Sequence, residues 1–569
     1  MTGYEVTGSE VSDQFNLGSH TRKISTTSEH AQHWFNLGLN WCYGFNQEEG
    51  VKCFLKALEY DPECVMAHWG VAYGAGPFYN YAWCDFSAEQ AASATRFCHN
   101  HITAAVGYSD KASDLENRLV KALACRFQKP HPVPQDEFNQ WDDAYANAMR
   151  EVYQDYSDDH DVMALFAEAM MTRTPWKLWD VSLGVPPANA DTYEALEIVE
   201  RSIAMNDASG SPPHPAILHL HIHITEMSNE PERAMRSADL LVDLCPDAGH
   251  LNHMPGHVYV LCGEYAKAKQ VSEKSIAADE KYLAYAGPHN FYTTARCHDL
   301  HLMMYTCMFL GQYQASIVAA EQMCETLSEE VLRKSGRSQV LYTMEGYYSM
   351  KMHVLVRFGR WQEIIESQLP QDAELYCVST AMHHYAKGVA NAALKNFAAA
   401  EQQRGLFHAA VARIPRNRKF FNNPACTTLG VGEKMLDGEL EYHQGNYELA
   451  FEHLRESVQR DDKLEYTEPW AWMHPPRHAL AALLAEQGNY EEAEDVYRTD
   501  LGLNDKLHRC AQHPDNVWAL HGLVECLRHR KDKTDLALYT EKLNRALAQS
   551  DGSVKSSCMC RTVGSVENQ

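Results

Sequence analysis

The chain has 569 residues, 45% of them hydrophobic, and a formal net charge of −26. That length exceeds one simple compact core, so several domains or a repeat array are expected. A surface that tracks phosphates needs clustered Lys and Arg, and a membrane-spanning helix needs about 20 consecutive apolar residues. The acidic balance and the lack of such an apolar run exclude nucleic acid and a membrane from the expected partners.

The first twenty residues have no basic start followed by an apolar core, so no secretory signal is expected. Seventeen cysteines stand at irregular spacing, without a CxxC zinc framework. That usage is typical of reduced, buried thiols in a cytoplasmic protein. We predict loose tails at 1–30 and 549–569, with the folded array at 31–548 between them.

Residues 31–62 carry the strongest motif of the chain. Its positions are Trp34, Leu37, Gly38 and Trp41, followed by Gly50, Phe54, Ala57 and Pro62. This is the tetratricopeptide pattern of a helix, a turn and a second helix in about 34 residues. Large side chains on the first helix fit between small ones on the second, and the proline ends the unit.

Further units follow the same plan. A Gly-x-Tyr turn followed by a small residue recurs at Gly263, Gly311, Gly445 and Gly488, with a variant at Gly359. Stacked helical pairs of this kind form a superhelix with a concave binding face. The predicted fold is therefore all-α, an α-solenoid of tetratricopeptide-like repeats with long loops over the concave face.

The long loops are three segments rich in proline and aromatic residues, namely 172–191, 413–428 and 466–478. Long segments without repeats are typical of ordered functional loops. We expect them to close the concave face, with Trp176, Trp179 and Trp472 excluding water. The alternative is that they are surface connections whose aromatic side chains pack locally.

Thirty histidines are the one anomaly of composition, and metal-ligand side chains are densest between His214 and Tyr305. In tetratricopeptide proteins the first helix of each unit lines the concave face. When unit positions are counted back from the turns, the resemblance implies that certain residues of four successive units face the concave side. They are His219, His223 and Glu226; His250, His253 and His257; His298, His301 and Tyr305; and His353.

The spacing of these side chains favours a metal site. Two histidines four residues apart on a helix can share an ion, and a carboxylate one turn further on can join them. Imidazole with carboxylate suits iron, copper, zinc or manganese, which is the cofactor we predict. Three protein ligands and an open position would be catalytic, whereas two His and one carboxylate would suit iron and oxygen chemistry. The candidate ligands are His219, His223, Glu226, His250, His253 and His257.

A plainer interpretation stands beside this one. A single inward histidine is usually a hydrogen-bonding groove residue, and His221 lies off the inward set, where it would pack between helices. Pro255 prefers the first turn of a helix. A helix that began near Met254 would leave His250 and His253 on its entry loop, where the inward count fails although a loop can still supply ligands.

Four runs of the sequence resemble a family of large tetratricopeptide-repeat proteins, most of them bacterial and mostly uncharacterised. The runs are 35–77, 161–180, 214–234 and 249–268. The resemblance extends from about Ala31 to about Leu527, and it is more distant to tetratricopeptide repeat protein 38. It implies an α-solenoid and supplies no settled activity or cofactor. Where a small serine-like residue is expected after Pro255, this chain has Gly256.

Two functions compete on the sequence alone. The first is a metal-dependent enzyme, an oxidoreductase or a hydrolase, acting on a small molecule in the concave cavity. Tyr305, His298 or His301 would serve there as general acid or base. The second is a non-catalytic scaffold that holds a peptide in the concave groove and mediates protein–protein interaction. We expect the enzyme, because a scaffold gives no reason to gather so many imidazoles with Glu226 on one face.

Overall fold

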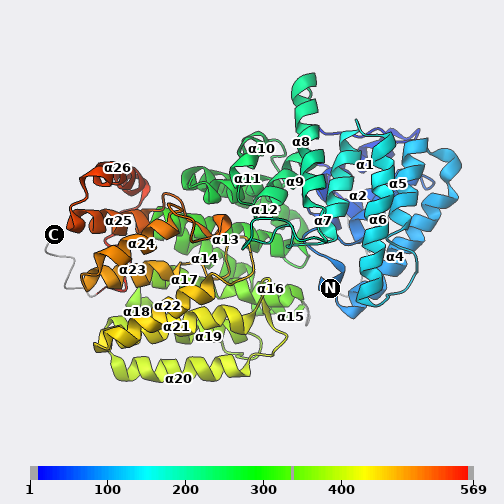
Figure 1. The fold of residues 1–569 in the computed structure, drawn as a ribbon. Helices are drawn as coiled ribbons and strands as arrows, with labels where there is room; N and C mark the ends of the chain where they lie inside the picture. Colours follow the sequence, from blue (N-terminus) through cyan, green and yellow to red (C-terminus); the bar gives the residue numbers. More distant parts are fainter. Residues whose placement is uncertain (1–10, 335–338, 562–569) are drawn as a thin grey trace. The chain divides into compact units, whose positions relative to one another are not determined.

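The computed structural model describes residues 11–334 and 339–561. Within these ranges the chain is built almost entirely of α-helices, with a single short β-hairpin (Figure 1). It folds as two compact units: Met1–Val258 with Glu273–Arg296, and Tyr259–Ser272 with Cys297–Gln569. The outermost tail residues, 1–10 and 562–569, lie outside the described residues, as do 335–338. Each unit is described by itself.

The helices of the first unit begin shortly after the N-terminal segment. They are α1 (Glu29–Tyr43), α2 (Gln47–Tyr60), α3 (Val65–Ala75), α4 (Ala88–Gly107), α5 (Asp114–Ala124), α6 (Gln135–Asp155), α7 (His160–Thr172), α8 (Thr192–Ser209), α9 (Pro215–Thr225) and α10 (Met235–Leu241). Helices α11 (Gly249–Leu261), α12 (Tyr265–Ala286) and α13 (Tyr292–Leu310) carry residues of both units.

The remaining helices belong to the second unit. They are α14 (Tyr313–Thr326), α15 (Glu329–Lys334), α16 (Gln339–Tyr348), α17 (Lys351–Arg357), α18 (Trp361–Glu366), α19 (Cys377–Ala393), α20 (Phe397–Arg413), α21 (Ala425–Gln444), α22 (Tyr447–Asp461), α23 (Pro476–Glu486), α24 (Tyr490–Asp500), α25 (Val517–Arg530) and α26 (Lys533–Gln549). The hairpin pairs β1 (Lys419–Phe420) antiparallel with β2 (Asn423–Pro424).

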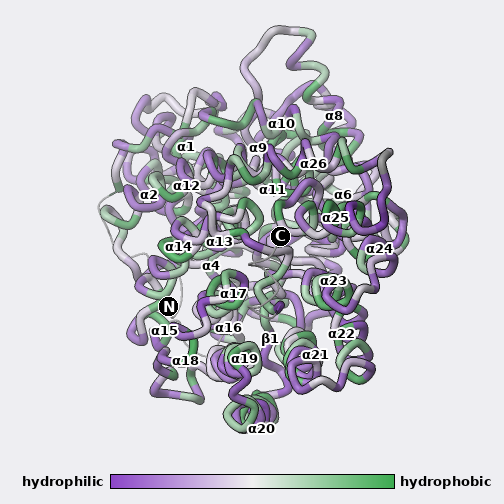
Figure 2. The backbone as a smooth tube through the Cα atoms, turned by 90° about the vertical axis from the view of Figure 1, so that its left-hand side faces the viewer, coloured by the Kyte–Doolittle hydropathy of each residue, from purple (hydrophilic) through white to green (hydrophobic). Residues whose placement is uncertain are grey.

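Consecutive helices pack as hairpins in both units, for example α1 with α2, α19 with α20 and α21 with α22. Apolar and polar residues interleave along α21 and α22, as expected for helices that bury one face (Figure 2). The predicted all-α fold, an α-solenoid of tetratricopeptide-like hairpins, is confirmed. All five predicted turn glycines have positive φ, at Gly263 (77°), Gly311 (69°), Gly359 (63°), Gly445 (90°) and Gly488 (81°). Only glycine adopts that conformation without strain, which explains the recurring turn.

The first predicted unit, residues 31–62, forms α1 and α2. Phe54 of α2 is fully buried between two glycines on neighbouring helices. A Cβ atom added at Gly38 would lie 2.7 Å from the Phe54 ring, and one at Gly70 would lie 2.6 Å from it. The motif's glycine therefore serves packing: it lets the backbone of α1 approach a large aromatic ring.

Replacing Gly38 by alanine is therefore expected to destabilise the first unit by about 1–3 kcal/mol, the cost of overpacking a tight core. Urea unfolding measures this change. Gly107→Ala is the matched control, because no atom lies within 4 Å of a Cβ built there. Equal unfolding midpoints for the Gly38→Ala and Gly107→Ala variants would contradict this view of the hairpin.

The segment 11–28, assigned above to an N-terminal tail, is placed against the first unit. Phe15, Leu17 and Ile24 are buried. The Phe15 ring packs edge-on against Trp41, with ring centroids 5.2 Å apart. Among the described residues no helix is both long and apolar enough to span a bilayer.

Candidate metal centre

Helix α9 carries three histidines in the run PAILHLHIHIT, and every residue of this helix is buried. Its start is well defined, because Pro215 occupies the first turn and the His214 ring accepts a hydrogen bond from the Ile217 N–H at 3.4 Å. Helices α1, α7, α8 and α10 all pack against it. Aliphatic side chains between the histidines fill these interfaces, which fixes the direction of each imidazole.

Helix α11 supplies the other histidines. It runs from Gly249 to Leu261 without a break and contains Pro255 in its interior. The alternative in which a helix starts near Met254 is therefore wrong, and His250 and His253 are helical. Pro255 removes one backbone hydrogen bond from the helix interior and its ring crowds the preceding turn, a cost that the packing of α11 offsets.

His219, His223 and His250 converge in the first unit. One potential ligand atom from each lies within 4.8 Å of the other two. Their exposed fractions are 1%, 0% and 3%. Nitrogens bound at about 2.0–2.1 Å to a tetrahedral zinc ion lie about 3.3 Å apart. Small side-chain adjustments would therefore bring the three imidazoles to coordination distance.

Hydrogen bonds determine which ring nitrogen faces the centre. Nδ1 of His219 lies 2.8 Å from the carbonyl oxygen of Tyr43, which can only accept, so Nδ1 carries the proton. Nδ1 of His223 likewise donates to a carboxylate oxygen of Glu226 at 2.7 Å. In its neutral form, each ring then has its lone pair on Nε2. The His219 Nε2 is buried and has no hydrogen-bond partner in the described part of the chain, as expected for an atom that coordinates an ion.

Glu226 has a different position from the three imidazoles. Its other carboxylate oxygen accepts a hydrogen bond from Nδ1 of His257 at 2.6 Å. The carboxylate is fully buried and bridges His223 and His257. This contact orients both rings, which is the part that carboxylates beside ligating histidines commonly play.

His253 and His257 form a close pair, with their Nε2 atoms 2.6 Å apart. Because Nδ1 of His257 donates to Glu226, its Nε2 accepts and that of His253 donates. Two nitrogens this close lie nearer than the spacing of about 3.3 Å in a tetrahedral site. The six predicted ligands are thus gathered in one unit: three converge on a centre, and Glu226, His253 and His257 form a network beside them.

An aromatic shell surrounds the three imidazoles. The centroid of the Phe45 ring lies 4.3 Å from that of His219 and 5.4 Å from that of His250. Tyr79 packs against His223, with centroids 5.0 Å apart. Burial, and then the nearby charge of His223, hold the pKa of His219 well below its ordinary value. The His219 imidazole is therefore neutral at physiological pH, the form that binds metal.

Two of the three predicted lid tryptophans lie at this site. Trp176 stacks on Tyr79 with ring centroids 5.6 Å apart. The Trp179 indole N–H donates to the Ile224 carbonyl of α9 at 2.6 Å. Trp472 belongs to the second unit, where its ring packs against Tyr385. The loop after α7 therefore covers α9, while the third tryptophan packs locally.

The predicted acid–base residues lie in the second unit. Nδ1 of His298 is 3.4 Å from the Tyr347 hydroxyl. His301 is buried beside Tyr347, and burial, followed by the charge of His353, lowers its pKa to about 3. Burial, followed by the charge of Asp500, raises the pKa of Tyr305 well above its ordinary value. Neither shift brings the pKa of the group near neutral pH, where the pKa of an effective general acid or base lies.

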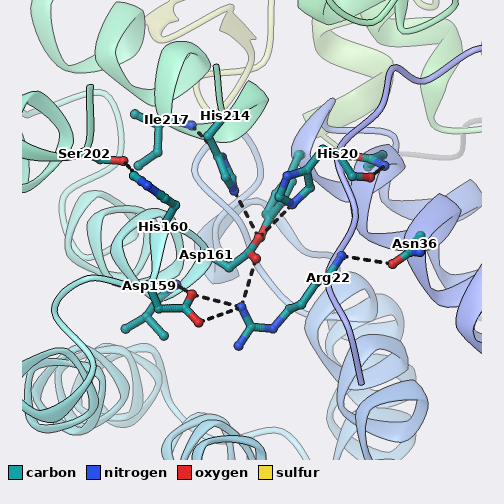
Figure 3. A network of polar contacts seen from close by, with 12 residues as sticks. His20, Arg22, Asn36, Asp159, His160, Asp161, Ser202, His214 and Ile217 are labelled. Atoms are coloured by element: carbon teal, nitrogen blue, oxygen red, sulfur yellow. Dashed lines mark hydrogen bonds and ion pairs between the residues drawn. The ribbon is translucent and has the colours of Figure 1, made fainter. Parts of the chain in front are cut away.

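A second cluster in the first unit was not expected. Asp161 accepts hydrogen bonds on one oxygen from the Tyr43 hydroxyl at 2.6 Å, His20 at 3.0 Å and His214 at 3.1 Å, and on the other from Arg22 at 2.9 Å (Figure 3). His20, His214 and Asp161 have the spacing of metal ligands. Arg22, however, already balances the carboxylate, so we interpret this cluster as a clamp that holds the segment 11–28.

Breaking the clamp with Asp161→Asn is expected to cost about 2 kcal/mol, the value of a hydrogen bond to a charged group. Burial would raise the pKa of Asp161, but the hydrogen bonds from His20 and His214 hold it well below its usual range. The clamp therefore contributes its full free energy of unfolding above the pKa of an aspartate in the unfolded chain, about 3.9. That contribution is lost as the pH falls through the lower pKa of Asp161 in the folded state. Urea unfolding between pH 7 and pH 3 measures it. Exposed Asp158 provides the control variant, Asp158→Asn.

Comparisons with known proteins find only structural similarity, with low TM-scores. No protein-family model matches the chain, and no curated protein matches it. The human IFIT1 dimer with m7Gppp-AAAA aligns over 92% of this chain and 91% of its own, at 11% identity and a TM-score of 0.30. Yeast Tom70 aligns over 90% of this chain and 92% of its own, at 10% identity and a TM-score of 0.25. The APC/C hetero-tetramer Cut9–Hcn1 aligns over 92% of this chain and 96% of its own, at 13% identity and a TM-score of 0.23. Scores this low carry no argument about function.

Proposed function

We propose that this protein binds one transition-metal ion through ring nitrogens of His219, His223 and His250. The observation that carries the proposal is the convergence of three buried imidazoles from α9 and α11, each offering a ligand atom within 4.8 Å of the others. A cluster of fully buried imidazoles is costly unless each ring nitrogen is satisfied. A metal ion would satisfy the His219 Nε2 that hydrogen bonding leaves without a partner.

The surroundings favour zinc over iron. An iron site of two His and one carboxylate would need Glu226 as a ligand. Both oxygens of Glu226 instead accept hydrogen bonds, one from His223 and one from His257. Three imidazoles with an orienting carboxylate match a catalytic zinc site, and a bound ion would activate a water or polarise a substrate carbonyl. A metal-dependent hydrolase is therefore the enzyme class that we propose, in preference to an oxidoreductase.

Cobalt(II) substitution tests the proposal. The expected result is strong visible bands of tetrahedral cobalt(II) at one equivalent of ion, lost in a His219→Ala variant. His221→Ala is the matched control, because His221 is buried on the same helix but bonds to Ser237 instead. Bands that persist in His219→Ala, or that vanish equally in His221→Ala, would rule out the proposed ligand set.

A second candidate is a scaffold that mediates protein–protein interaction, and the helical-hairpin architecture favours it. The first unit offers a surface for this role. Leu183, Val185 and Tyr193 are 70%, 46% and 60% exposed, at the loop after α7 and the start of α8. A Leu183→Ser/Tyr193→Ser variant is expected to lose specific cross-links to a partner, while Leu538→Ser, at another exposed leucine, keeps them.

A further inference from the structure

The second unit contains a disulfide that the proposed metal centre does not use. It joins Cys558 to Cys560 in the C-terminal segment, with their Cα atoms 5.3 Å apart. A disulfide stabilises a protein mainly by restricting the unfolded chain, and this effect grows with the length of the loop that the bridge closes. A bridge that encloses only Met559 restricts little of the chain, so stability does not explain why it forms.

The bridge departs from the reduced thiols that the sequence predicts. Cys426 is an exposed free thiol, and Cys42, Cys53 and Cys98 are buried ones. Thiols that stay unpaired in both settings are typical of a protein that works under reducing conditions. Disulfides that form under such conditions are usually transient, and they serve catalysis or redox sensing. A bridge that opens and closes is therefore the form expected for this pair.

The segment around the bridge is held in place by contacts that do not involve sulfur. The Tyr497 hydroxyl of α24 donates a hydrogen bond to Oγ of Ser557 at 2.6 Å, and both side chains are fully buried. On the other side of the bridge, Arg561 forms an ion pair with Glu525 of α25 at 2.7 Å. These anchors keep the two cysteines together when the bridge is open, so the thiols can pair again without refolding of the chain.

The two sulfurs of the bridge differ in their access to solvent. Cys558 is partly exposed, whereas Cys560 is only 2% exposed. Thiol–disulfide exchange begins when a thiolate reaches one sulfur of the bridge, so access selects the sulfur that reacts. The backbone N–H of Cys560 also donates a hydrogen bond to Sγ of Cys558 at 3.3 Å. Such a donor stabilises negative charge on that sulfur when the bridge is open, and the thiolate is the reactive form. Both features favour Cys558 as the sulfur that exchanges with external thiols.

We propose that Cys558 and Cys560 form a redox-active pair that exchanges electrons with small thiols. In the reducing direction, the thiolate of one small thiol attacks Sγ of Cys558, and the bond between the two protein sulfurs breaks. Cys560 leaves as a thiolate and takes up a proton, while a mixed disulfide remains on Cys558. A second small thiol then attacks the sulfur of the first, which releases Cys558 as a thiol and the two small molecules as their disulfide. The protein gains two electrons and two protons, and the site is independent of the proposed metal centre.

The reverse sequence closes the bridge. The thiolate of Cys558 attacks the disulfide of an oxidised small thiol, and one small thiol leaves with a proton. The thiolate of Cys560 then attacks Sγ of Cys558 and expels the second small thiol. This second step occurs between neighbouring groups of one chain, so it is fast and the mixed disulfide is short-lived. The state of the bridge therefore follows the ratio of reduced to oxidised thiol around the protein.

Graded glutathione mixtures test the proposal on the full wild-type chain. Folded protein is equilibrated at rising ratios of reduced to oxidised glutathione, its thiols are blocked with an alkylating reagent, and the tryptic peptide 556–561 is analysed by mass spectrometry. The expected result is one reversible transition from a bridged peptide to a peptide with two alkyl groups. Cys426 is the internal control, because this exposed free thiol should only gain or lose glutathione. Two alkyl groups in excess oxidised glutathione, or a bridge that survives excess reduced glutathione, would overturn the proposal.

Two variants test the order of the steps. In Cys560→Ser the mixed disulfide on Cys558 has no neighbouring thiol to resolve it, so glutathione should accumulate there under oxidising mixtures. In Cys558→Ser the remaining thiol is buried, so it should gain several-fold less glutathione in the same time. Circular dichroism checks that both variants are folded. Equal labelling of the two variants would show that access does not direct the exchange, and it would overturn the role of Cys558.

Discussion

Removal of the bound metal is expected to lower the unfolding free energy of the first unit by about 4 kcal/mol, relative to protein at a metal concentration 1,000 times its Kd. The ion would hold α9 to α11 through His219, His223 and His250. Without it, the three imidazoles remain buried together, and the His219 Nε2 keeps no hydrogen-bond partner in the described part of the chain. Calorimetry with and without chelator measures the change, and amide exchange in α9 shows that the loss is local.

The control for this prediction is the His219→Ala/His223→Ala variant, whose stability should not respond to chelator or to added ions. A chelator effect of the same size in that variant would mean that the metal acts elsewhere on the chain. A wild type that is equally stable with and without metal would contradict a role for the ion in holding the two helices.

Glu226→Gln is expected to weaken metal binding about 10- to 100-fold, the usual cost of losing a partner that orients ligating histidines. Glu226 accepts hydrogen bonds from two rings, at 2.7 Å from His223 and 2.6 Å from His257. A glutamine has one acceptor oxygen and can serve only one of them. The other ring loses its fixed orientation, although the three proposed ligands remain. Competition with a chromogenic chelator measures the change in Kd.

X-ray absorption separates this role from direct coordination. If Glu226 only orients the rings, the wild type and Glu226→Gln have the same all-nitrogen protein ligands. A lost oxygen ligand in the variant would show that Glu226 binds the ion itself. Glu200→Gln is the control, because Glu200 contacts the off-site His221 at 3.6 Å and should leave the affinity unchanged.

The helical hairpins could be predicted because their determinants are local. Gly38 and Phe54 stand at the spacing of the two helices of one repeat unit. The recurring Gly-x-Tyr turns need a positive φ, which is observed at Gly263 and Gly445. The division into two units has no such local signal, since repeats of one kind continue through both. The burial of Phe15 and Leu17 could not be predicted from the sequence, because it depends on helices far away in the chain.

The site could be predicted only in part. Helical spacing placed His219 and His223 on one face of α9, and they converge with His250. Spacing says nothing about hydrogen bonding, so the bridging position of Glu226 between two rings was not visible. Phe45 was missed because it lies in the turn after α1, where it has a positive φ of 55° and no periodic neighbour indicates its direction.

Metal content tests the central claim most directly. Untagged protein, purified without chelator, should contain about one equivalent of a transition metal by mass spectrometry, with zinc the expected element. The His219→Ala/His223→Ala variant should contain none, and His221→Ala should match the wild type. Folded wild-type protein that contains no metal and takes up none from added ions would contradict the proposed site and leave the scaffold as the better account of this fold.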